Sequence, residues 1–289
     1  MNFTFVKEAA TVHKDVVASV RQLIKPGIKV IDICKHIEAK IASCFKGDIF
    51  DYECGIAFPV GVSINNVAAH DSAWSNEDNR TIDIDDIVKI DFGVHVHGHL
   101  VDSAFTLAWN PCHFNLMRAS KEALDAAIKI AGSDVRLCDV SEAIVEVVDS
   151  FDGIKPVVNI GGHNILPYKV HGGKFIPCCK TNDNTKMKEG EVYAIEVFTT
   201  KTTKKGVARM NLSVPFTHFS LDTKTSKQVD QRLIRRRTLP FSNRWYDISE
   251  IESLCTKYPP LICDGPVAQF EHTLLIGDKV EVVTRNDFY

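Results

Sequence analysis

Apolar residues recur at helical spacing in two separate stretches of the chain, and each stretch holds two such runs. The first run ends at Lys25-Pro26-Gly27, a helix stop signal, and the next follows Asp32, which we expect to be its N-cap. A break at Gly132-Ser133-Asp134 separates the two runs of the second stretch. The apolar positions are Val12, Val16, Val17, Val20 and Ile24; Ile33, Ile37 and Ile41; Ala119, Ala123, Ala127 and Ile130; and Val140, Ile144 and Val147. This pattern predicts two pairs of amphipathic helices, each followed by strands with Gly, Asn and Asp turns.

The chain also repeats itself in order. The run Asp86–Phe92 returns as Glu191–Val197, both acid–aliphatic–x–x–Ile–acid–apolar, and Lys29–Ile33 returns as Arg136–Val140. The repeat predicts an α+β fold of two pseudo-symmetric helix–helix–strand halves, roughly residues 1–111 and 112–289. Residues 199–265 fit the repeat poorly and are expected to contain an inserted helical or irregular segment.

Residues 89–106 alternate between polar and apolar positions and turn near Val96-His97-Gly98, which predicts a β-hairpin. A symmetric turn there would set Asp91 directly opposite Asp102, with both carboxylates on one face. The other face is apolar and consists of Val88, Ile90, Phe92, Val101 and Phe105. Because opposed like charges destabilise a sheet, this pair needs a compensating cation.

Two further acids take comparable positions. Glu196 stands where Asp91 stands in the repeat, and Glu271 points away from its apolar neighbours Phe270 and Leu274. Four clustered carboxylates would repel one another strongly, and two divalent cations would remove that cost and activate a water. The alternative is that the acids line separate solvent-exposed faces of antiparallel strands.

Histidines near these strands are the other candidate functional groups. His163 lies among glycines, where the backbone could bring it to a metal, and His70 and His171 suit proton transfer or oxyanion stabilisation. His272 shares a face with apolar residues and is expected to be a hydrogen-bonded core residue. The hairpin tip carries three more, expected on a surface turn: His95, His97 and His99.

Composition and charge exclude several functional classes. With 34 Lys+Arg against 37 Asp+Glu, the net charge of −3 gives no general case for binding nucleic acid or an anionic membrane. No uncharged apolar run is long enough to span a bilayer, and charged residues interrupt the N-terminal stretch, so neither a membrane anchor nor a signal peptide is expected. The nine cysteines form no C-x-x-C pair and are expected to be reduced thiols of a cytoplasmic protein.

Five motifs together resemble the type 2 methionine aminopeptidases, metallopeptidases of the pita-bread fold, nearly from end to end. The motifs are Lys89-Ile-Asp-Phe-Gly93, Asp102-Ser-Ala-Phe-Thr106, Gly162–Lys174, Gly190–Glu196 and Ala268–Thr273. The resemblance implies a curved antiparallel sheet with helices outside it. It also implies a helical insertion, at about residues 212–263, that distinguishes type 2 from type 1.

The resemblance implies a site for two divalent metal ions, for which Mn, Co, Fe and Zn are all suitable. Its five ligands map onto Asp91, Asp102, His163, Glu196 and Glu271. Asp91 would bind one ion, His163 and Glu196 the other, and Asp102 and Glu271 would bridge them. Glu196 would also act as proton shuttle, His171 would stabilise the tetrahedral intermediate, and His70 would lie near the scissile nitrogen.

The implied reaction is removal of the N-terminal Met from nascent proteins and peptides. Phe58 and Val170 match positions of the methionine pocket, and His218 is the nearest match to a further pocket histidine. His218 lies in a segment, Lys201 to Phe219, that lacks the family's usual glycine-rich pattern. The partners implied are peptides beginning with Met, with the ribosome as a further candidate, for a protein expected to be monomeric and to bind neither membrane nor nucleic acid. The sequence starts almost at its first helix, whereas eukaryotic members usually carry a long basic extension on which ribosome association can depend.

Two other functions are compatible with this fold. A non-catalytic nucleic-acid or ribosome-binding protein would carry degenerate ligands and a basic surface, and neither is apparent here. A proline-specific relative, a prolidase or X-Pro aminopeptidase, would usually carry an extra N-terminal domain. The triple arginine Arg235–Arg237 is expected to lie on a solvated charged face.

Overall fold

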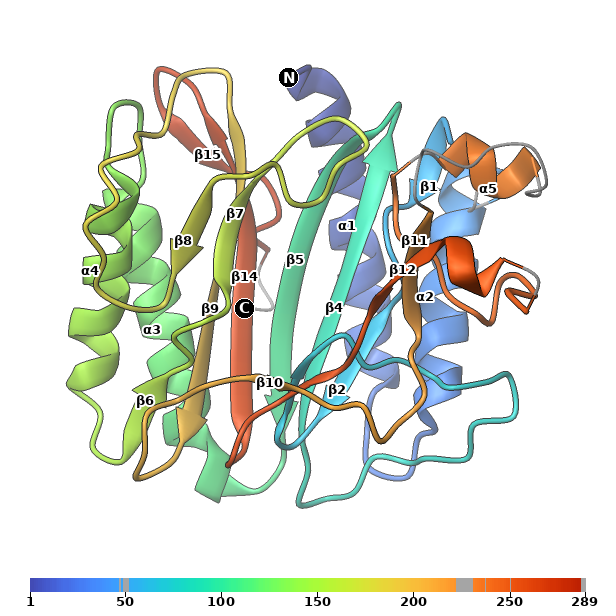
Figure 1. Cartoon of the computed structure of the whole chain (residues 1–289), viewed down its shortest axis with the longest axis horizontal. Coiled ribbons are helices and arrows are strands. Elements are labelled where there is room, and N and C mark those ends of the chain that lie inside the picture. The colour runs from blue at the N-terminus through green and yellow to red at the C-terminus, as the bar shows by residue number, and fades with distance from the viewer. Residues whose placement is uncertain (47, 49–51, 222–230, 237, 250, 287–289) are drawn as a thin grey trace.

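The computed structural model describes residues 1–46, 48, 52–221, 231–236, 238–249 and 251–286. Long antiparallel strands cross the middle of the molecule, and four helices lie behind and beside them (Figure 1). The helices are α1 Phe3–Leu23, α2 Val30–Phe45, α3 Phe114–Ile130 and α4 Leu137–Asp149, with a short α5 at Gln231–Arg236. Helix α1 packs on α2 and on β4 and β5, and α3 packs on α4 and on β9 and β14.

The four long helices follow the predicted apolar periodicity. Helix α1 starts after Asn2, whose side chain accepts a hydrogen bond from the Thr4 N–H at 3.0 Å, and it ends before Pro26. The expected N-cap of α2 is wrong: Lys29 is the N-cap residue, and Asp32 lies inside the first turn. A carboxylate there still favours the helix, because the helix dipole is positive at that end.

The strands form two larger sheets. One has the order β1-β4-β2 with β5 paired to β4; the other has the order β15-β14-β9-β7-β8 with β6 paired to β9. Their strands are β1 Cys54–Ile56, β2 Gly61–Ile64, β4 Ile87–Val96, β5 His99–Ala108, β6 Ile154–Pro156, β7 Gly161–Ile165, β8 Phe175–Pro177, β9 Val192–Lys201, β14 Val267–Ile276 and β15 Val280–Val282. Smaller sheets contain β3 Val67–Ala69, β10 Arg209–Met210, β11 His218–Leu221, β12 Cys255–Tyr258 and β13 Leu261–Ile262.

Side-chain hydroxyls join the two larger sheets where β5 meets β14. Ser103 Oγ donates to the Glu271 carbonyl at 2.6 Å, and Thr106 Oγ1 donates to the Gln269 carbonyl at 2.6 Å. Thr273 Oγ1 donates to the Asp102 carbonyl at 2.6 Å and accepts from the Asp102 N–H at 2.8 Å. These bonds satisfy buried backbone groups that no strand ladder pairs, so they fix the two sheets side by side.

The predicted β4–β5 hairpin is present, but its predicted register is wrong. Asp102 lies opposite Gly93 and Asp91 lies opposite Ala104. The turn consists of His97 and Gly98 alone, both with positive φ, so Val96 pairs with His99. The shift is two residues, and because side chains alternate with a period of two, the two acids still share a face.

The back face of these strands is the hydrophobic core, as predicted from their alternation. Val88, Ile90, Phe92, Val101 and Phe105 are all fully buried. Two buried histidines accompany them. His13 of α1 stacks on Phe92 and its Nε2 lies 3.1 Å from the Phe92 carbonyl; His272 of β14 hydrogen-bonds Thr284 Oγ1 at 3.0 Å, as its core assignment required.

Strands β11 and β12 and helix α5 lie beside β1 and α2, at the right of Figure 1. The expected solvated face at Arg235–Arg237 is wrong for Arg236, which is fully buried and donates to the carbonyls of Ile56, Ala57 and Pro240 at 2.8–3.2 Å. The Arg235 side chain and residue 237 lie outside the described part. Among the described helices, none combines the length and apolarity that a membrane crossing requires.

Candidate metal centre

Four carboxylates lie on the front face of the four longest strands, two from each of the larger sheets. Asp91 is on β4 and Asp102 on β5, and Glu196 is on β9 and Glu271 on β14. In the β9–β14 ladder Glu196 lies directly opposite Glu271. The facing pair that the sequence pattern predicts in the first sheet is thus found in the second.

A glutamine that the sequence analysis did not select connects the two sheets at this point. Gln269 Nε2 donates to Glu196 Oε2 at 3.1 Å and lies 3.3 Å from Asp91 Oδ2. The sequence feature that could have identified Gln269 is its position two residues before Glu271 on β14, which puts both side chains on one face of the strand.

His163 of β7 approaches the same group of acids. Its Nε2 lies 3.6 Å from Asp102 Oδ2 and 3.9 Å from Glu196 Oε1. Ligand atoms of Asp102, His163 and Glu271 all lie within 4.8 Å of one another, and all three residues are buried. Glu196 adjoins this trio through His163, and Asp91 is linked to Glu196 through Gln269.

Burial and mutual repulsion disfavour the charged forms of these acids. Burial raises the pKa of Asp91 to about 7, partly opposed by the Gln269 hydrogen bond. Burial also raises the pKa of Asp102, Glu196 and Glu271 well above their ordinary values, and the neighbouring carboxylates add to the rise. Burial lowers the pKa of His163 to about 3, so this imidazole is neutral and can act as a ligand.

The donor set fits divalent cations. Within the described part of the chain, Asp91 Oδ1 and both carboxylate oxygens of Glu271 are buried and accept no hydrogen bond. Buried acceptors are almost always satisfied, so unsatisfied carboxylate oxygens beside three further ligand-type side chains point to cations between them. Such cations would also offset the repulsion that raises the pKa values.

Three more histidines border the acids. The His171 ring, in the loop between β7 and β8, lies 4.3 Å from the His163 ring, and the His70 ring lies 5.7 Å from the His218 ring. Burial lowers the pKa of His70 to about 4 and of His218 to about 3, and it also lowers the pKa of His171. All three are therefore neutral near pH 7 and can each donate and accept one hydrogen bond.

A cavity of about 430 Å³ opens in front of the acids and histidines. Phe58 and Val170 line it, as does His218, so the residues selected as a pocket do border the acid cluster. Apolar lining residues that the sequence analysis missed are Pro59, Ile160, Phe175, Phe198, Leu221, Tyr258 and Leu261. Several of them come from segments outside the matched motifs, where a sequence pattern carries no information about which cavity they reach.

The hairpin-tip histidines lie away from this group of acids. The expectation of a surface turn is wrong for His95, which is fully buried with its ring 6.3 Å from that of Tyr168. His97 is exposed, as expected. His99 is partly buried beside Met1 and Phe5.

Comparison with known proteins gives consistent results along the whole chain. The model of metallopeptidase family M24 matches residues 4–278. The chain is 36% identical to methionine aminopeptidase 2A of Arabidopsis thaliana, over 99% of this chain and 71% of the relative. It is 38% identical to methionine aminopeptidase 2 of Kluyveromyces lactis, over 98% of this chain and 76% of the relative.

Solved structures share the fold at low sequence identity. A methionine aminopeptidase from Thermotoga maritima superposes with a TM-score of 0.72 at 20% identity, covering 98% of this chain and 96% of the other. A thermophilic Arx1 superposes with a TM-score of 0.79 at 18% identity, covering 99% and 91%. With nearly every residue inside the family match, and with the expected α+β sheet-and-helix architecture in place, the chain belongs to metallopeptidase family M24 and has its pita-bread fold.

Proposed function

We propose that this protein is a metal-dependent methionyl aminopeptidase, which hydrolyses the first peptide bond of peptides and nascent proteins that begin with Met. The observation that carries the proposal is the convergence of four strand-borne acids and His163 on one cavity whose remaining wall is largely apolar. Relatives named methionine aminopeptidase 2 at 36–38% identity support the choice of reaction. An intact set of ligand-type side chains argues against a binding module with degenerate ligands.

We propose that Asp91, Asp102, His163, Glu196 and Glu271 hold two divalent cations. When bound, such cations would polarise the scissile carbonyl and lower the pKa of a water molecule toward about 7. The protein's contribution is to keep this ligand group dry and fixed. The hydroxyl bridges of Ser103 and Thr273 do so by joining strands from both sheets.

The other polar groups suit the movement of protons and the orientation of substrate. Glu196 reaches the cavity with a partly exposed carboxylate and would take a proton from water and deliver it to the leaving nitrogen. Neutral His171 would donate a hydrogen bond to the carbonyl oxygen as negative charge develops on it, and His70 would bind near the scissile nitrogen. Phe58 and Val170 would contact the Met side chain, with His218 at the cavity wall next to His70.

We also propose the organisation of the chain that the repeat suggests. The halves 1–111 and 112–289 each begin with two helices, α1–α2 and α3–α4, and each supplies two of the four acids. The segment at about 212–263 carries β11, β12 and α5 and is assigned as the insertion. A monomer in the cytoplasm is the proposed working form.

The test is release of Met from a Met-Ala-Ser peptide by the purified protein with added Mn or Co, with an X-Pro peptide as comparator. Met release is expected from the wild type, and Asp102→Ala and Glu271→Ala are expected to abolish it. Glu142→Ala is the control, because this acid is exposed and forms its ion pair with Lys180 at the surface. A wild-type protein that releases no Met with either metal, or that prefers the X-Pro peptide, would refute the proposal.

A further inference from the structure

The backbone at His70 has an uncommon conformation. Its φ is +63°, in the left-handed region that residues other than glycine seldom adopt. Such a conformation costs free energy and persists only where neighbouring groups hold it. The residues around His70 must therefore hold its backbone in this conformation.

A buried ion pair fixes the residue that directly follows His70. Asp71 Oδ2 lies 2.8 Å from Arg80 Nη1, and its other oxygen accepts from Trp74 Nε1 and from the Ser72 N–H, both at 3.0 Å. The Asp71 carbonyl accepts from the Val62 N–H at 2.9 Å, which attaches it to β2. Both carboxylate oxygens and the carbonyl of Asp71 thus have hydrogen-bond partners.

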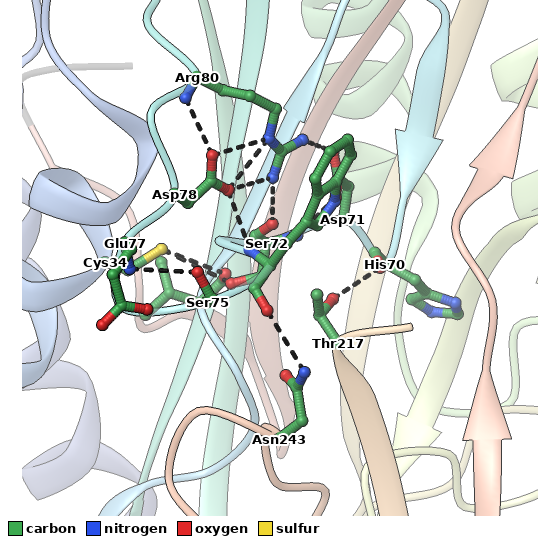
Figure 2. A network of polar contacts seen from close by, with 12 residues as sticks. Cys34, His70, Asp71, Ser72, Ser75, Glu77, Asp78, Arg80, Thr217 and Asn243 are labelled. Atoms are coloured by element: carbon green, nitrogen blue, oxygen red, sulfur yellow. Dashed lines mark hydrogen bonds and ion pairs between the residues drawn. The ribbon is translucent and has the colours of Figure 1, made fainter. Parts of the chain in front are cut away.

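Arg80 holds this turn from its other end (Figure 2). Its guanidinium donates to both oxygens of Asp78 and to the Ser72 carbonyl, and it lies 3.8 Å over the Trp74 ring. The Arg80 carbonyl accepts from the Val30 N–H at 2.9 Å, at the first residue of α2. The Arg80 guanidinium therefore links the two ends of the 71–80 loop to each other, and the Arg80 carbonyl links the loop to α2.

The His70 side chain points away from this network, toward the cavity (Figure 2). Thr217 Oγ1 donates to the His70 carbonyl at 3.3 Å, and Ala69, which precedes His70, pairs with Leu261 in the β3–β13 ladder, so the backbone is held on both sides of the His70 Cα. The direction of the imidazole follows from the backbone at this residue, because a positive φ rotates the side chain relative to its neighbours.

The nearly buried carboxylates of Asp71 and Asp78 depend on the Arg80 cation for charge balance. The Asp71 side chain is 6% exposed and that of Asp78 is 2% exposed, whereas Arg80 is 24% exposed. Removal of the cation would leave two nearly buried carboxylates without a counter-charge, which is much more unfavourable than the loss of a surface pair. The loop would then rearrange, and His70 directly precedes it.

We propose that Asp71 and Arg80 are positioning residues that set the direction of the His70 imidazole in the active site, an inference that rests on the proposed aminopeptidase function. They act through the backbone and touch no substrate. Their substitution is expected to change turnover through His70 and to leave the rest of the site as it is.

The test uses Asp71→Asn, which keeps the shape of the side chain, and Arg80→Lys, which keeps its charge. Neither variant can form the ion pair between a guanidinium and the residue 71 carboxylate. Both variants are expected to lower kcat for Met-Ala-Ser about 10- to 100-fold, the range for misplacement of a reacting group, while KM changes less than about 3-fold. The matched control is Arg136→Lys, because Arg136 makes the same kind of pair with Asp139 at the exposed start of α4. This control should keep wild-type kinetics.

A double-mutant cycle separates positioning from a structural role. If Asp71 acts through His70, Asp71→Asn should have no further effect on kcat in a His70→Ala background. An equal loss in both backgrounds, or wild-type kcat in both single variants, would overturn the inference.

A second measurement does not depend on turnover. The His70 ring signals in an NMR spectrum, assigned by their disappearance in His70→Ala, should shift in Asp71→Asn and Arg80→Lys but not in Arg136→Lys. Unshifted His70 ring signals in either variant would overturn the inference, so the measurement is decisive even if the other variant folds poorly. A wild-type protein that releases no Met would instead count against the proposed function.

Discussion

The two strand pairs that carry the acids reach the same face by different routes. The β4–β5 pair is a hairpin closed by a two-residue turn, and its acids are staggered: Asp91 lies opposite Ala104 and Asp102 opposite Gly93. The β9–β14 pair joins strands that are far apart in sequence, and Glu196 lies directly opposite Glu271. The two acids of the second pair thus face each other directly, but Asp102 of the first pair is the neighbouring charge that raises the pKa of both most. The first pair gains its register locally from the turn.

The apolar back faces of the β4–β5 and β9–β14 strand pairs are more alike than their acid-bearing front faces. Each has a buried histidine, His13 behind β4 and His272 on β14, and burial lowers the pKa of both to about 3. The apolar back face thus tolerates a neutral, hydrogen-bonded polar group, whereas the front face carries carboxylates whose charged forms are disfavoured until a cation or a proton balances them. Substitutions on each pair can test both parts of this statement.

The largest expected effect is on catalysis by the facing pair. Glu196→Gln keeps the shape of the side chain but removes its charge and its capacity to accept a proton, so kcat should fall about 10²- to 10⁴-fold. Met release from Met-Ala-Ser measures it, with Glu189→Gln as the control because Glu189 is exposed on the preceding turn. Near wild-type turnover of Glu196→Gln would show that the second pair does not carry the proton transfer.

The next effect concerns the turn that sets the register of the first pair. A Cβ at Gly98 would lie 2.2 Å from the Tyr168 ring, and Gly98 has a φ of +75°, so Gly98→Ala should lower the free energy of unfolding by about 2–4 kcal/mol. Gly153→Ala is a matched control, because its φ is +70° and nothing lies within 4 Å of its added Cβ. Urea unfolding should show a loss of only about 1–2 kcal/mol for the control. Equal losses in the two variants would mean that the Tyr168 contact does not hold the hairpin tip.

The contrast between the pairs also explains how far the sequence could predict the site. Alternation in 89–106 predicts a hairpin with both acids on one face, because a period of two is a local property. The two-residue error in register arose because His97 adopts a positive φ, which sequence does not select strongly outside Gly, Asn and Asp. That Glu196 faces Glu271 depends on a pairing between distant strands, which no local pattern encodes.

The buried arginine and the bridging glutamine show the same limit. Arg236 belongs to a run of three arginines, which normally indicates a solvated face, yet tertiary contacts bury it against the carbonyls before Phe58. Local alternation puts Gln269 on the face of Glu271, but its links to Glu196 and Asp91 depend on contacts between distant strands. The helices, in contrast, were predictable, because their apolar periodicity is repeated over many turns.

A smaller effect is expected on the stability of the metal-free protein. With a chelator at pH 7.5, Glu271→Gln removes a carboxyl group whose pKa is raised well above its ordinary value by burial and by the charges of Asp102, Glu196 and Asp91. Because a raised pKa in the folded state lowers stability at neutral pH, this variant should raise the free energy of unfolding by about 1–2 kcal/mol. Asp91→Asn should raise it less, because Asp91 has no acid opposite it and already accepts a hydrogen bond from Gln269. Urea unfolding of both variants measures the difference, and added Mn should reverse it by stabilising the wild type more. A loss of stability in metal-free Glu271→Gln would contradict the assigned repulsion.

The smallest expected effect is on the pH dependence of stability, and it tests the apolar back face of the β4–β5 pair. His13 has a pKa of about 3 in the folded protein and 6.5 as its ordinary value, so the unfolded state binds the extra proton first and wild-type stability falls as pH drops below 6.5. His13→Gln cannot titrate, and relative to this variant the wild type should lose about 1 kcal/mol between pH 7.5 and pH 5.8. The control substitution is His97→Gln at an exposed position, made in both backgrounds, which should leave the difference between wild type and His13→Gln unchanged. Parallel pH dependences for His13→Gln and wild type would mean that the back face accepts the charged imidazole, which would remove the distinction between the two faces.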